Sequence, residues 1–232
     1  CQSRAVFPYD ERLRLLVPYL QQLEMESNGK SVMADGSPAV RATAPVTWGG
    51  VGTDAQHAVF QLLHQGSDLI PVEFVAVTEQ EDGQDPAHHR ALLLNAFAQG
   101  AALMAGEVDD VPYRACPGDR PSATILLDRL DPRTLGALVA FYEHRTFANA
   151  VLMGINPFDQ FGVELGKRLA RQLGEPESRD GFDPSTRKLI ERAGLSATIT
   201  CSSLAPAQAG SERPASPPPT APKCAQPRGT KA

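Results

Sequence analysis

Apolar residues recur at helical spacing in three segments of the chain. The first segment is predicted to be a helix that Asp10 can cap, with a buried face made of Leu13, Leu16, Leu20 and Leu23. A second helix is predicted near residues 87–105, and a third begins at Pro132, because proline is favoured at the first helical position. The residues expected to face inward from the second helix are Leu92, Leu93, Ala96, Phe97 and Ala101.

Short apolar runs at 45–49, 69–77 and 123–127 are predicted to be strands, and the last of them is expected to be buried. Strands that alternate with helices are typical of a parallel sheet flanked by helices. The pattern therefore predicts an α/β fold.

A glycine-rich turn follows the first predicted strand. Residues 49–52 lead into a helix that Thr53 or Asp54 can cap and that ends at Gly66. His57 is then expected in the first helical turn, where the helix dipole disfavours a charged imidazolium. The turn lacks the lysine that closes a P-loop and the spacing of a dinucleotide site, so it is a weak indication of nucleotide binding.

The periodic pattern changes again towards the end of the chain. Pro157 is expected to end the third helix, because proline excludes the preceding residue from helical geometry. Another helix is predicted beyond it, and Asp183 or Ser185 can cap a last one. We therefore expect one folded domain over residues 1–196 and a disordered tail rich in Pro, Ala and Ser over 197–232.

Composition narrows the class of protein. Of the 232 residues, 42% are hydrophobic and 21% charged, and the formal net charge is -5, which argues against a general nucleic-acid binder. No apolar run approaches the roughly 20 residues that span a membrane, and no secretory signal is recognisable, so a cytoplasmic location is expected. The four cysteines are not spaced as metal ligands or as a disulfide framework. Neither a metal site nor a cofactor is indicated.

Three polar motifs carry the strongest functional signal. They cover residues 25–30 (MESNGK), 52–66 (GTDAQHAVFQLLHQG) and 158–167 (FDQFGVELGK). In this order and at these intervals they resemble the glucose-6-phosphate isomerase family, over roughly residues 5–195. The resemblance implies a sugar isomerase (SIS)-like domain followed by C-terminal helices.

The resemblance is to the C-terminal part of that family. The family's Gly-Gly-Arg-Tyr-Ser signature and its Ser/Thr-rich phosphate loop are absent from this sequence. The resemblance implies that the missing part also contains an arginine that steadies the enediolate of the reaction. Loss of one such preorganised cation from a developing oxyanion costs about 100- to 1000-fold in rate. We therefore expect the chain alone to be nearly inactive.

The resemblance also implies the roles of four residues in interconverting glucose 6-phosphate and fructose 6-phosphate through an enediol. Glu26 would be the base, His57 would open the sugar ring together with Lys167, and Gln160 would line the substrate pocket. Family members are homodimers in which the histidine motif reaches into the partner's active site. The implied partners are thus a hexose 6-phosphate and a second copy of the chain, without nucleic acid or membrane.

Simpler interpretations remain open for each residue. Glu26 could be an ordinary exposed carboxylate, His57 a satisfied core histidine and Gln160 a helix cap. His64 is interpreted as structural, and Glu164 as a residue that steadies nearby cations. For the whole chain, the alternatives to an isomerase are a sugar-phosphate-binding module without catalysis, and a relic without function. The presence of a base together with a ring-opening pair favours the enzyme.

Overall fold

The computed structural model describes residues 2–81 and 83–195. The chain divides into two compact units, Cys1–Glu164 and Leu165–Ala232. The predicted tail, residues 197–232, lies outside the described residues, so its disorder and the domain boundary before it stay predictions.

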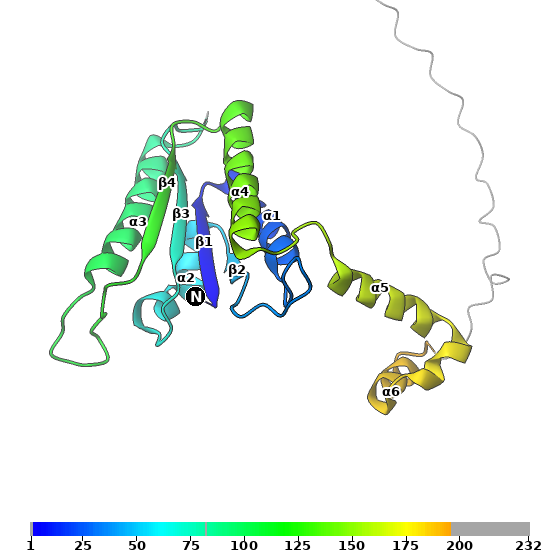
Figure 1. Cartoon of the computed structure of the whole chain (residues 1–232). Coiled ribbons are helices and arrows are strands. Elements are labelled where there is room, and N and C mark those ends of the chain that lie inside the picture. Colours follow the sequence, from blue (N-terminus) through cyan, green and yellow to red (C-terminus); the bar gives the residue numbers. More distant parts are fainter. Residues whose placement is uncertain (1, 82, 196–232) are drawn as a thin grey trace, which may run out of the picture. The chain divides into compact units, whose positions relative to one another are not determined.

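Four parallel strands form a single sheet in the order β2-β1-β3-β4 (Figure 1). They are β1 (Ser3–Tyr9), β2 (Val46–Gly49), β3 (Val72–Val77) and β4 (Ser122–Leu127). This confirms the predicted parallel α/β sheet. β3 begins later than the apolar run at 69–77 because Pro71 has no N–H to give to a strand ladder.

The central strand β1 is absent from the prediction, although its residues 5–9 are all buried. Pro8 lies inside it, and proline is disfavoured within a sheet because it cannot donate a hydrogen bond. The N–H of Val46 donates to the carbonyl of Gln2 at 2.9 Å. The backbone N–H and C=O groups of the even-numbered residues of this segment therefore point towards β2. β2 ends at Gly49, opposite Val6. The missing N–H of Pro8 therefore faces a point beyond the end of β2, and no ladder bond is lost.

Helices cover both faces of the sheet (Figure 1). One face packs on α2 (Gly52–Gln65) and α3 (Pro86–Ala105), and the other on α1 (Leu16–Leu20) and α4 (Pro132–Met153). Alternate strand residues supply the two cores: Phe7 and Phe74 point to the α2–α3 side, and Val6 and Val75 to the α1–α4 side. The sheet therefore has helices packed on both of its faces.

The first predicted helix is divided into three successive helical forms. A 3₁₀ turn, η1 (Glu11–Leu13), precedes α1, and a π-helix, η2 (Gln21–Glu26), follows it. Asp10 caps the first form as predicted, since its Oδ1 accepts from the N–H of Arg12 at 2.9 Å. The predicted apolar face is confirmed, because Leu13, Leu16 and Leu20 are buried and Leu23 packs against them.

Helix α2 begins differently from the prediction. Neither Thr53 nor Asp54 caps it; Val51 is at the N-cap and provides no side-chain hydrogen bond. Gly52 is the first helical residue, and a Cβ there would lie 2.4 Å from the ring of Tyr9, so close packing selects glycine. His57 is consequently the sixth residue of the helix and lies in its second turn rather than its first. The effect of the helix dipole on His57 is weaker there than predicted.

The third predicted helix, α4, ends earlier than Pro157. Gly154 stops it in the left-handed conformation, with φ 67°, which glycine adopts without a steric penalty. Helix α5 (Phe161–Gly174) begins after Gln160, and η3 (Pro176–Gly181) and α6 (Pro184–Arg192) follow. Asp183 caps α6 by accepting from two backbone N–H groups, which confirms one of the two predicted caps.

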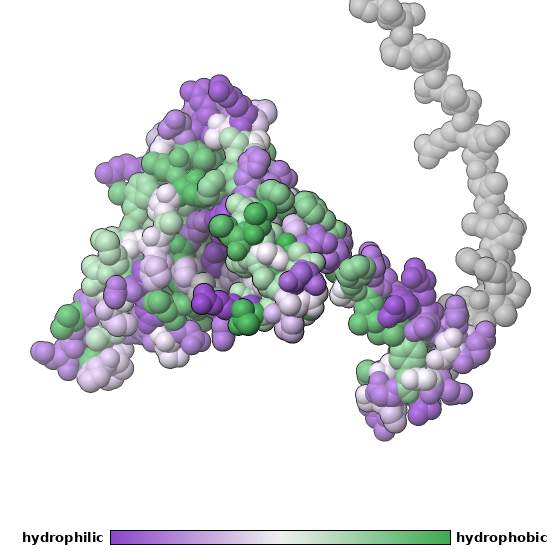
Figure 2. Space-filling view, in the orientation of Figure 1, coloured by the Kyte–Doolittle hydropathy of each residue, from purple (hydrophilic) through white to green (hydrophobic). Residues whose placement is uncertain are grey.

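Strand β4 is far less covered than predicted. Its residues are mostly exposed, with Leu126 at 50%, and within the described part of the chain it pairs only with β3. On α3, Phe97 is 43% exposed and Ala101 is also exposed, so the expectation that they face inward is wrong. Apolar side chains gather on the surface over β4 and along α4 (Figure 2). Among the described residues, β4 is an edge strand of the sheet.

Candidate functional site

A cavity of about 430 Å³ opens where η2 faces the segment after α4. Glu26, the last residue of η2, and Gln160, the residue before α5, both line it. These two predicted site residues come from motifs far apart in the sequence. The other polar residues of its wall are Tyr19, Gln22, Ser27 and Glu143.

Close packing directs the chain immediately after Glu26. The Nδ2 of Asn28 is buried and donates to the carbonyl of Thr146 in α4 at 3.0 Å. A Cβ at Gly29 would lie 2.3 Å from the carbonyl oxygen of Met25, so glycine is needed where the chain leaves the helix. These contacts hold the MESNGK motif against α4.

Lys30 joins this motif to the one that contains Gln160. Its Nζ lies 2.9 Å from Oδ1 of Asp159, and it donates to the backbone carbonyls of Asp159 at 2.5 Å and Glu26 at 3.2 Å. Only 12% of the lysine side chain is exposed. The ammonium group therefore fixes the separation of the two cavity walls.

Replacing Lys30 by Met is expected to loosen this junction. Hydrogen bonds to charged groups contribute about 1.5–3 kcal/mol, so the amides of Val163 and Glu164, which bond to the carbonyl of Gln160, should exchange with solvent on the order of tenfold faster. Hydrogen–deuterium exchange of the chain measures this. The matched control is Lys188→Met on the exposed surface of α6, which should leave those amides unchanged. Equal exchange in both variants would show that Lys30 does not hold the junction.

His57 lines a different cavity, of about 510 Å³, together with Gln56, Phe60, Gln61, His64 and Gln99. This cavity and the one at Glu26 have no lining residue in common. The imidazole of His64 lies 2.9 Å from Oε1 of Gln99 and packs near the ring of Phe60, as expected of a structural residue. Within one chain, the structure does not bring His57 to Glu26.

Lys167 lies on α5 in the second unit and is exposed. Gln160 is not on the same helix, since α5 begins at Phe161 and the carbonyl of Gln160 accepts from the first-turn N–H groups of Val163 and Glu164. The seven-residue spacing of Gln160 and Lys167 predicts that both address one ligand from a single helix, and the structure contradicts this because α5 begins after Gln160. Their convergence on a shared substrate stays a prediction.

Sequence reasoning missed three other polar residues of the Glu26 cavity. Gln22 lies one turn before Glu26 on η2, and the hydroxyl of Tyr19 donates to Oε1 of Glu143 at 3.1 Å. Burial, and then this bond to the carboxylate, raise the pKa of Tyr19, which keeps its hydroxyl protonated as a donor. Gln22 could have been suspected from the sequence, because it belongs to the polar pair Gln21-Gln22 just before the MESNGK motif. No local pattern pairs Tyr19 with a residue on α4.

No group of three or more His, Cys, Asp or Glu side chains among the described residues could hold a metal ion. No helix in residues 2–81 and 83–195 combines the length and the apolar character that crossing a membrane requires.

Comparison with known families decides the relationship. The family model described as phosphoglucose isomerase matches residues 1–190. The chain belongs to the phosphoglucose isomerase family. The resemblance predicted from the three motifs is thereby confirmed.

Individual members of the family agree. The glucose-6-phosphate isomerase of Rhizorhabdus wittichii is 74% identical over 192 residues, covering 83% of this chain, and that of Zymomonas mobilis is 61% identical. A crystal structure of the glucose-6-phosphate isomerase from Chlamydia trachomatis superposes with a TM-score of 0.76 at 38% identity over 84% of this chain. The chain spans 38% of the length of each of these three relatives. The predicted sugar isomerase fold is confirmed by the solved phosphoglucose isomerase.

Proposed function

We propose that this chain supplies the base and one wall of the substrate pocket of an enzyme that interconverts glucose 6-phosphate and fructose 6-phosphate. The observation that carries the proposal is that Glu26 and Gln160 line the same cavity. Membership of the phosphoglucose isomerase family supports the choice of substrate. The cytoplasmic location and the homodimer predicted from the sequence are part of the same proposal.

The reaction moves one proton between neighbouring carbons of the open sugar. The Glu26 carboxylate takes the proton from C2 of the aldose while the C1 oxygen gains a proton, which leaves an enediol. It then returns its proton to C1 while the C2 hydroxyl loses one, which forms the ketose. A carboxylate suits both steps because the same oxygen accepts and then donates the proton. Gln160 has an amide that both donates and accepts, so it can hold sugar hydroxyls beside Glu26. The exchange is redox-neutral overall, and the proposal requires no cofactor.

Ring opening is assigned to His57 and Lys167. An imidazole exchanges protons near neutral pH, and an ammonium group placed at the ring oxygen favours its release. Because His57 and Glu26 line separate cavities of one chain, we assign His57 to the active site of a second copy. Each active site would then combine Glu26 from one chain with His57 from the other.

The test uses a chimera, since this chain spans 38% of the length of its relatives. The matched segment of this chain replaces the corresponding segment of the Rhizorhabdus wittichii isomerase. A coupled assay then follows glucose 6-phosphate formed from fructose 6-phosphate. A properly folded chimera without isomerase activity would disprove the proposed function.

Co-expression of two inactive variants tests the shared site. Chimeras carrying Glu26→Gln and His57→Gln are expected to be inactive separately. When they are made together in equal amounts, about half of the dimers are mixed, and each mixed dimer has one intact site of two. About a quarter of the unmodified activity should therefore return. The control is co-expression of Glu26→Gln with itself, and a mixture that recovers nothing would place His57 and Glu26 in one chain.

A further inference from the structure

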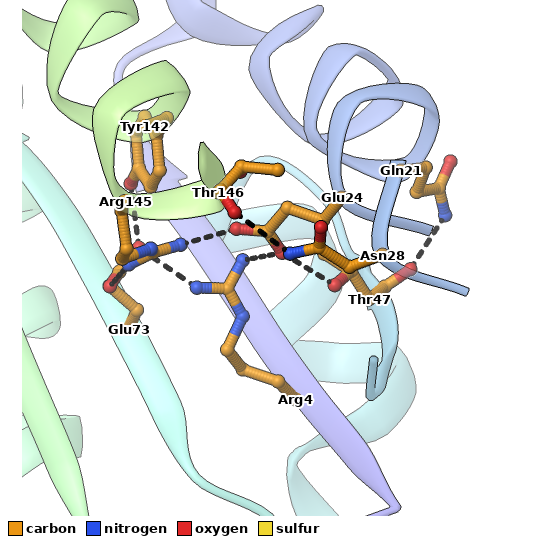
Figure 3. Close-up of polar contacts among 9 residues, drawn as sticks. All are labelled: Arg4, Gln21, Glu24, Asn28, Thr47, Glu73, Tyr142, Arg145 and Thr146. Atoms are coloured by element: carbon orange, nitrogen blue, oxygen red, sulfur yellow. Dashed lines mark hydrogen bonds and ion pairs between the residues drawn. The ribbon is translucent and has the colours of Figure 1, made fainter. Parts of the chain in front are cut away.

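Four charged side chains form a closed ring beneath the π-helix that ends at Glu26 (Figure 3). Each comes from a different element: Arg4 from β1, Glu24 from η2, Glu73 from β3 and Arg145 from α4. All four are largely buried, with 10–22% of each side chain exposed. Two positive and two negative groups balance, so the ring carries no net charge.

Glu24 is the most heavily bonded member. Its Oε1 accepts from Nη2 of Arg145 at 2.6 Å, and its Oε2 accepts from Nη2 of Arg4 at 2.5 Å and from the hydroxyl of Thr47 at 2.9 Å. Three donors from three different elements therefore restrain one carboxylate. Such a group has almost no freedom to turn.

Glu73 anchors the other side of the ring in the central sheet. Its Oε2 accepts from Nη1 of Arg145 at 2.8 Å, and its Oε1 accepts from the hydroxyl of Tyr142 at 2.6 Å. Burial, together with this carboxylate, raises the pKa of Tyr142 and keeps the hydroxyl a donor. Burial alone would lower the pKa of Arg145, but Glu73 and Glu24 outweigh it and the pKa is raised. Arg145 is thus a permanently charged link between β3 and η2.

The π-helix places Glu24 and Glu26 in different surroundings. Glu24 is buried in the ring, whereas Gln22 and Glu26 line the cavity. A π-helix has a wider turn than an α-helix, occurs rarely and is frequent at functional sites. The ring is attached to the same six-residue element that presents Glu26.

Stability alone does not account for such a ring. Removing two buried ion pairs from water costs about as much as their attraction returns, and well-packed apolar side chains of similar volume often stabilise a protein as much or more. A guanidinium that bridges two carboxylates instead holds both carboxylates in a fixed orientation. Here the fixed element is η2.

We propose that Arg145 is a positioning residue, which through Glu24 holds η2 so that the Glu26 carboxylate points into the cavity. The proposal rests on the proposed function of Glu26 and extends it to a residue that touches no substrate. Arg145 lies in α4 and acts through its bond to Glu24. Its second bond, to Glu73, is to the sheet strand β3.

Arg145 bonds to Glu73 through Nη1 and to Glu24 through Nη2, which allows a matched test in the chimera. Glu24→Gln and Glu73→Gln each weaken two ion pairs, one with Arg4 and one with Arg145, and keep the side-chain shape, but only Glu24 belongs to η2. We expect Glu24→Gln to lower kcat about 10- to 100-fold with KM within about twofold, as a small misplacement of a reacting group does. Glu73→Gln should lower kcat much less, even at a similar loss of thermal stability. Arg145→Met should behave as Glu24→Gln, and Arg145→Lys should recover part of kcat.

Two further measurements separate the possible failures. If Glu24→Gln and Glu73→Gln lower kcat equally, or if neither lowers it, the positioning role is disproved, whereas an active Glu26→Gln chimera would disprove the proposed function instead. Hydrogen–deuterium exchange of amides 24–29 in the 232-residue chain is independent of activity. Faster exchange in Glu24→Gln than in Glu73→Gln supports the proposal, and equal exchange contradicts it.

Discussion

Replacing Glu26 by Gln in the chimera is expected to lower kcat for fructose 6-phosphate about 100- to 10,000-fold. Glutamine keeps the shape of the side chain, so folding and the cavity should be unchanged, but its amide cannot take and return a proton. Substrate binding depends on other groups of the pocket, and KM should change far less than kcat. The coupled assay for glucose 6-phosphate, run over a range of substrate concentrations, measures both constants.

The same cavity contains a second carboxylate, which provides a matched control for this experiment. Glu143 is a second carboxylate on the same wall, and it accepts a hydrogen bond from Tyr19. Glu143→Gln should therefore produce the smaller of the two losses in kcat. If Glu143→Gln abolishes the reaction and Glu26→Gln does not, the base has been assigned to the wrong carboxylate.

The largest loss of stability is expected from Phe7→Ala in the 232-residue chain. Phe7 is completely buried in the middle of β1, and its ring lies 4.8 Å from that of Phe60, 6.1 Å from that of Trp48 and 6.3 Å from that of Phe74. Truncating a buried phenylalanine removes its apolar contacts and leaves a cavity, which costs about 3–5 kcal/mol. A domain is stable by only about 5–15 kcal/mol, so a large part of the total would be lost. Urea unfolding followed by circular dichroism measures the change.

Phe97→Ala is the matched control for this substitution. The ring of Phe97 lies on α3 and is 43% exposed, so a smaller apolar area returns to water when it is removed. The loss of unfolding free energy should be clearly below that of Phe7→Ala. Equal losses would mean that the burial of Phe7 does not determine the cost of its truncation.

Much of the fold could be predicted because its signals are local. The period of the apolar residues predicted α3 and α4. Pro132 predicted the start of α4, and Gly66 predicted the end of α2. β1 was missed because Pro8 argues against a central strand when the length of the neighbouring β2 is unknown. The exposure of β4 and of Phe97 could not be predicted either, since an apolar run does not reveal which element covers it.

Only those residues of the site that lie in the sequence motifs could be predicted. Glu26 and Gln160 were found because their neighbours in sequence are distinctive, and the structure places them on one cavity. The charged ring was not found, although Arg4 and Glu73 interrupt otherwise apolar strands, which is a usable signal of buried charge. Which carboxylate each arginine meets depends on the order of the strands and the position of α4. Spacing along the chain carries none of that information.

Within residues 2–81 and 83–195, no strand pairs with the outer edge of β4, which has a practical consequence for handling the chain. Residues 122–127 contain neither a charge nor a proline, and their free N–H and C=O groups form a template on which another strand can add. Raising the concentration of the purified polypeptide therefore favours sheet-to-sheet aggregation through this strand. Dilute samples are the appropriate ones for the unfolding and exchange experiments.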